Sequence, residues 1–63
     1  MRAVSSTGRI PTRHVRIEDV SPDDTDEEIL ALALEFTGES RSSLFGTRVE
    51  RFGDVAAVSL YTD

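Results

Sequence analysis

The fold class follows most directly from one stretch, residues 25–38, which read TDEEILALALEFTG. Thr25 and Glu28 have the spacing of a capping box, in which the hydroxyl accepts a backbone N–H three residues on and the carboxylate reaches back. The acidic side chains of the first turn suit the positive end of a helix dipole. Gly38 is a typical left-handed helix stop. The stretch therefore predicts a helix that starts after Thr25 and ends at Thr37.

The predicted helix is amphipathic at about 100° per residue. Its apolar arc comprises Ile29, Leu30, Ala33, Leu34, Phe36 and Thr37, with Leu32 at the border. Its opposite side comprises Glu27, Glu28, Ala31, Glu35 and Glu39. Such a helix needs a second element against which to bury the apolar arc.

Strands are predicted on both sides of this helix. In residues 12–20, Val15 and Ile17 alternate with polar side chains, the period of a strand with one buried face. Residues 44–52 and 55–61 predict two more strands around Gly53-Asp54, a two-residue loop typical of a type II′ hairpin. That loop places Phe52 opposite Val55, Val49 opposite Val58, and Thr47 opposite Leu60.

The order strand, helix, strand, strand predicts an α+β domain over residues 12–63. A right-handed crossover leaves room for the last strand between the other two. We expect a β-α-β-β fold, with a three-stranded antiparallel sheet and the helix packed on one face. Residues 1–11 are rich in Ser, Gly, Arg and Thr and contain Pro11, so we expect a flexible basic arm. A short strand over residues 2–5 is the alternative.

One face of this sheet is expected to remain open. The covered face would hold Val15, Ile17, Val49, Val58 and Leu60. The open face would hold His14, Arg16, Glu18, Arg48, Glu50, Phe52, Val55, Ala57, Ser59 and Tyr61. The two sets could be exchanged in the hairpin strands, since its apolar pattern fits both. Exposed apolar surface ringed by polar groups often marks an interface, and Phe52 and Tyr61 are candidate aromatic anchors. Alternatively, both rings pack at the sheet edge or under the arm.

The composition excludes several classes of protein. Without cysteine, the 63 residues form no disulfide and offer no thiolate. The longest apolar run, residues 29–34, is far shorter than the roughly 20 residues that span a bilayer, and residues 1–10 lack the apolar core of a secretory signal. We expect a cytoplasmic protein with no membrane contact.

Every basic residue is Arg, a bias typical of high-GC genomes, which suggests an actinobacterium or one of its phages.

The net charge of −5 is unevenly distributed along the chain. Residues 17–40 carry nine acids and no Arg, and Glu28, Glu35 and Glu39 form a stripe without basic neighbours four residues away on the helix. This acidic ridge (Glu28, Glu35, Glu39) is a docking face for a basic protein or a solubility device. The alternative site is basic and would contact nucleic acid through Arg2, Arg9, Arg13, Arg16 and Arg48.

No motif for catalysis or metal binding is recognised. His14 is the one side chain that titrates near neutrality without help. The acids of residues 23–28 do not follow the calcium-loop pattern. There is no Gly-rich phosphate loop, no His/Cys metal spacing and no nucleophile elbow. We expect no catalytic residue, no metal and no cofactor.

Two resemblances add to these expectations. Residues 12–61 resemble the first two-thirds of an RNA recognition motif in topology. That family stacks bases on sheet aromatics, whereas residues 15–20 and 55–60 hold none here, so no binding residue carries over. The second helix and fourth strand of that family are missing.

The chain is also similar to small acidic phage proteins that inhibit host machinery, such as short phage inhibitors of bacterial RNA polymerase. The similarity consists of size, acidity, the capped acidic helix of residues 25–37 and the Thr-Arg-Val of residues 47–49. We therefore expect a non-enzymatic protein–protein interaction module, a phage or actinobacterial regulator or inhibitor that docks on a basic host protein. It could form a homodimer through the open sheet face. The alternative is a small nucleic-acid-binding protein.

Overall fold

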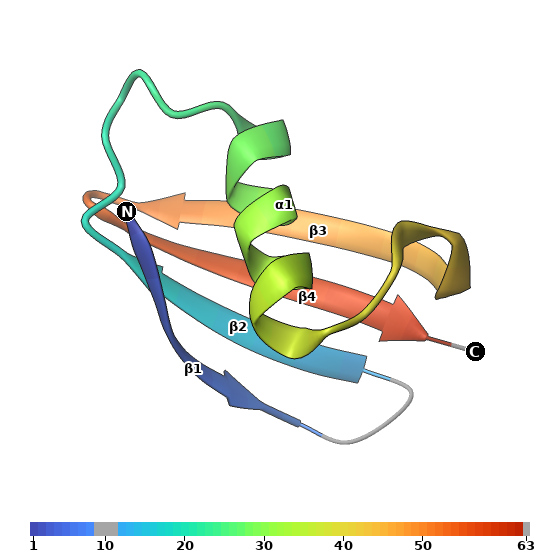
Figure 1. The fold of residues 1–63 in the computed structure, drawn as a ribbon. Coiled ribbons are helices and arrows are strands. Elements are labelled where there is room, and N and C mark those ends of the chain that lie inside the picture. Colours follow the sequence, from blue (N-terminus) through green and yellow to red (C-terminus); the bar gives the residue numbers. More distant parts are fainter. Residues whose placement is uncertain (9–11, 63) are drawn as a thin grey trace.

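A capped helix lies across one face of an antiparallel sheet in the computed structural model, which describes residues 1–8 and 12–62 (Figure 1). The sheet has four strands in the order β1-β2-β4-β3. The elements are β1 (Arg2–Thr7), β2 (Thr12–Glu18), α1 (Asp26–Thr37), the short 3-10 helix η1 (Arg41–Ser43), β3 (Leu44–Phe52) and β4 (Val55–Thr62). The α+β class is thus confirmed.

Helix α1 starts and ends where its sequence predicts. The Thr25 hydroxyl accepts the Glu28 N–H at 3.2 Å, and the Glu28 carboxylate accepts the Thr25 N–H at 3.0 Å. Gly38 is left-handed at φ 78°, and its N–H donates to the Leu34 carbonyl at 2.9 Å. Within residues 1–8 and 12–62, no helix has the length and apolar character needed to cross a membrane.

The C-terminal hairpin also has the predicted register. Phe52 pairs with Val55, Val49 with Val58 and Thr47 with Leu60. Gly53 has φ 64° whereas Asp54 does not have a positive φ, as a type II′ turn requires. Strand β4 lies between β2 and β3, as predicted.

The expected three-stranded sheet is wrong, because a fourth strand precedes β2. Residues 2–7, expected within a flexible arm with a short strand over residues 2–5 as the alternative, form β1. β1 pairs antiparallel with β2 from Arg2–Glu18 to Thr7–His14, so the alternative is the better prediction. A register shift between Ala3 and Ser5 interrupts the ladder. The element order is therefore β-β-α-β-β, and Ala3 packs against the core. The remainder of the expected arm, residues 9–11, lies outside the described residues.

The core lies between α1 and the covered face of the sheet. As predicted, Val15, Ile17, Val58 and Leu60 are fully buried and Val49 packs at the margin. The helix contributes Ile29, Leu30 and Ala33. Phe36 was expected in the covered arc but is 46% exposed. The buried side of the helix is centred on Ile29, Leu30 and Ala33, and Phe36 lies at the edge of that side.

Strand β2 is shorter than predicted. It ends at Glu18, because Asp19 adopts a left-handed conformation at φ 59° that breaks the extended chain. Val20 is nevertheless buried, and its N–H donates to the Asp54 carbonyl at 2.8 Å in the hairpin turn. This bond ties the end of β2 to the β3–β4 connection.

The fold predicts that adjacent residues of β1 respond differently to the same change. Ala3→Asn should lower the free energy of unfolding by about 1–3 kcal/mol, because it places a polar amide against the core. Val4→Asn, at an exposed position in the register shift, should lower it by under about 0.5 kcal/mol. Urea unfolding followed by circular dichroism measures both. Equal, negligible effects would mean that the segment is a flexible arm after all.

Candidate functional site

The open face of the sheet collects polar and apolar side chains from all four strands. Because side chains alternate along a strand, every second residue points away from α1, and no described element packs over this face (Figure 1). The face comprises Arg2, Ser5 and Thr7 of β1, His14, Arg16 and Glu18 of β2, Arg48, Glu50 and Phe52 of β3, and Val55, Ala57, Ser59 and Tyr61 of β4. The predicted open set is thus the observed one, extended by β1.

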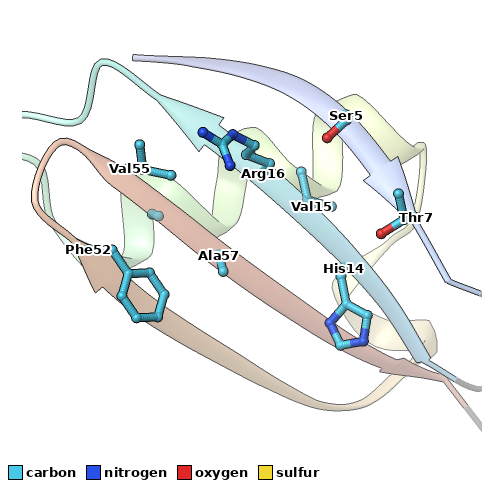
Figure 2. Close-up of a pocket in the computed structure, with 9 residues that line it drawn as sticks. Ser5, Thr7, His14, Val15, Arg16, Phe52, Val55 and Ala57 are labelled. Atoms are coloured by element: carbon cyan, nitrogen blue, oxygen red, sulfur yellow. The ribbon is translucent and has the colours of Figure 1, made fainter.

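A shallow hollow of about 240 Å³ lies in this face (Figure 2). The small side chain of Ala57 leaves the space, and the rings of Phe52 and His14 stand on either side of it. Phe52 is 61% exposed. The other side chains at the hollow include the apolar Val55 and the polar Ser5, Thr7 and Arg16, so its lining is mixed.

His14 and Ser59 form the cross-strand polar pair of this face. The His14 Nδ1 and Ser59 Oγ atoms are 3.1 Å apart, and Ser59 is only 8% exposed. A hydrolytic triad also needs an acid that orients the histidine, and among the described residues no carboxylate pairs with His14. The pair therefore supplies the hydrogen bond that a buried hydroxyl requires.

The charges of the open face are largely compensated within single strands. Arg16 Nε lies 3.1 Å from a Glu18 oxygen on β2, and Arg48 Nε lies 3.2 Å from a Glu50 oxygen on β3. Arg2 reaches Glu18 at 3.6 Å. The face consequently presents a mixed, nearly neutral charge pattern around the hollow.

The predicted basic site is not brought together as one patch. Arg2, Arg16 and Arg48 lie on the open face with the carboxylate partners just described, whereas Arg13 lies 3.8 Å from Glu39, the residue after the helix stop. Arg9 lies outside the described residues. The Arg side chains of the described part are thus divided between two faces and paired with acids.

The predicted acidic ridge is likewise reduced by its contacts. Glu28 belongs to the capping box, and Glu39 pairs with Arg13. Glu35 is exposed on α1 and, among the described residues, forms no ion pair. Neighbouring acids are compensated from distant segments: Glu27 by Arg41 at 2.8 Å and Asp26 by Arg51 at 3.0 Å.

The two predicted anchors share the open face but lie at opposite ends of it. Phe52 is beside Val55 at the start of β4, whereas the half-buried Tyr61 is opposite Gly46 and Thr12 at its end. Sequence reasoning missed Ala57 as the origin of the hollow. It also missed Phe45, which is 86% exposed at a register shift in β3. The size contrast between Ala57 and Phe52 was the available signal for the hollow.

Comparisons with protein-family models, curated proteins and solved structures find no match to this chain. The described residues contain no group of three or more side chains able to hold a metal ion. The open face of the sheet is therefore the feature of the described residues that bears most directly on function.

Replacement by serine should destabilise the protein to different extents on the two faces of the sheet. Phe52→Ser should lower the free energy of unfolding by under about 1 kcal/mol, because the ring is mostly exposed. Val58→Ser should lower it by about 3 kcal/mol or more, because it leaves a cavity and a buried hydroxyl. Chemical denaturation of the two variants compares them directly. A larger loss for Phe52→Ser would show that the faces are exchanged.

Proposed function

We propose that this chain is a non-enzymatic protein-interaction module that binds a partner protein through its open sheet face. The partner would place an aromatic side chain into the hollow between Phe52 and His14. The observation that carries the proposal is the exposed Phe52 ring beside a hollow on a face that no described element covers. Exposed apolar surface of this kind is typical of interfaces.

The size of the hollow favours a protein partner over a small molecule. Small-molecule sites are commonly about 300–1,000 Å³ and enclose most of their ligand, whereas this hollow has about 240 Å³ and is open on one side. One inserted side chain suits such a space. The apolar Phe52 and Val55 together with the polar Ser5, Thr7 and Arg16 suit an aromatic ring with a polar tip, such as tyrosine.

Charge would act mainly on the rate of association and on the choice of partner. The net charge of −5 attracts basic proteins at long range, and Glu35 contributes to this field from α1. A regulator or inhibitor of a basic bacterial or phage-host protein is the role that size and composition favour. Nucleic-acid binding has less support, because the described Arg side chains of the predicted site are paired with carboxylates.

A selection for peptide ligands tests the proposal without knowledge of the natural partner. A random peptide library displayed on phage is selected on the native chain, and the bound peptides are titrated while backbone amide shifts are recorded by NMR. We expect the selected peptides to share an aromatic residue and to shift His14, Phe52 and Ala57 together.

Matched variants locate the binding. Ala57→Trp fills the hollow and should weaken the selected peptides at least about tenfold, since the inserted side chain is the expected anchor. Ala31→Trp adds the same bulk to the exposed side of α1 and should leave affinity unchanged. Peptides rich in Lys and Arg that shift Glu28 and Glu35 instead would overturn the proposal in favour of the acidic ridge.

A further inference from the structure

β3 ends the sheet with an unpaired outer edge. No described strand lies beyond it, and after the register shift at Leu44/Gly46 its residues 46–52 pair regularly with β4. The opposite edge, β1, is shorter and is interrupted between Ala3 and Ser5. Irregular, short edges resist further pairing, whereas a long regular edge is a template for another strand.

The backbone groups available on this edge follow from the hairpin. In a two-residue hairpin the closing pair, here Phe52 and Val55, exchanges both backbone hydrogen bonds. The alternating residues Arg51, Val49 and Thr47 therefore direct their N–H and C=O groups away from β4. Among the described residues, none of the backbone hydrogen bonds outside the sheet ladders ends on these three residues.

Symmetry restricts how a second copy could pair here. Two identical strands pair antiparallel about a two-fold axis perpendicular to the sheet, and this operation keeps the open faces of both copies on one side. Opposite residues then share a face, so the register is centred on one residue facing itself. Only a few such registers exist for residues 46–52.

In the register centred on Val49, side chains of opposite charge face each other across the two-fold axis. This register places Arg48 opposite Glu50 of the second copy twice, once on each side of the axis. Centring on Arg48 would oppose two arginines, and centring on Glu50 would oppose two glutamates; like charges directly opposite destabilise a ladder. Centring on Thr47 leaves Glu50 without a basic residue opposite it.

Apolar contacts agree with the same register. Gly46 stands opposite Phe52 of the second copy, so that the exposed ring covers a glycine that has no side chain of its own, an arrangement that stabilises strands. On the covered face, Val49 lies at the margin of the core and is only half-buried. In this register it meets Val49 of the second copy and extends the core across the axis.

We infer that a second copy of this chain pairs antiparallel along β3, centred on Val49, to form a two-fold symmetric dimer with an eight-stranded sheet. Charged side chains on an edge commonly prevent pairing. Here Arg48 and Glu50 have opposite signs at a spacing of two around the central residue, which makes the edge complementary to itself. This inference goes beyond the proposed function and does not depend on it, because it uses the edge and not the hollow.

Charge reversal tests the register. Arg48→Glu and Glu50→Arg should each raise the dimer dissociation constant at least about tenfold, because each opposes like charges across the axis. The double variant Arg48→Glu/Glu50→Arg should restore the native constant. An equimolar mixture of the two single variants should form a heterodimer, since every cross-axis pair is then of opposite sign. Sedimentation velocity and native mass spectrometry measure these species.

The control is Arg16→Glu on β2, where Arg16 and Glu18 have the same spacing on the same face but lie inside the sheet. It should leave dimerisation unchanged, and circular dichroism checks that every variant is folded. A native chain that remains monomeric to about 1 mM overturns the inference, as do single variants that dimerise like the native chain. Loss of the dimer in Ala57→Trp with no effect of the charge variants also overturns it, in favour of stacking through the open face.

Discussion

A single twelve-residue helix can cover only one face of a four-stranded sheet, and the rest of the structure depends on this limit. A 63-residue chain buries only about 60% of the surface that its unfolded form exposes. The buried aliphatic side chains lie on the covered face, on the helix packed against it and at Val20. The other face must then be stable in water, and it achieves this through a hydrogen-bonded His14–Ser59 pair and ion pairs within strands.

Local patterns predicted the elements whose determinants lie within a few residues. The capping box of Thr25 and Glu28 and the Gly53-Asp54 turn each involve neighbours in sequence, and both have the expected geometry. The alternation of Val15 and Ile17 likewise predicted which face of β2 is buried. The hairpin register predicted which residues of β3 and β4 share a face, but the apolar pattern of the hairpin left open which of its faces is covered. The burial of Val58 and Leu60 decides this in favour of the predicted set.

Features that depend on distant contacts could not be predicted in this way. β1 contains only Ala3 as a core-facing apolar residue, so its extended conformation is due to pairing with β2 and not to a pattern of its own. The acidic ridge was predicted to be uncompensated because the helix itself places no Arg four residues from Glu28, Glu35 or Glu39. Within the ridge, Glu39 pairs with Arg13 from β2, and beside the ridge Glu27 pairs with Arg41 from η1.

The sheet order has a consequence for the folding mechanism. The β1–β2 and β3–β4 ladders join strands that are adjacent in sequence, whereas the β2–β4 ladder pairs positions 12–17 with positions 56–61. Short-range hairpins form within microseconds, while long-range pairings must first overcome the entropy of loop closure. We expect the β2–β4 ladder to form in the rate-limiting step. In that step α1 packs against two hairpins that are already partly formed.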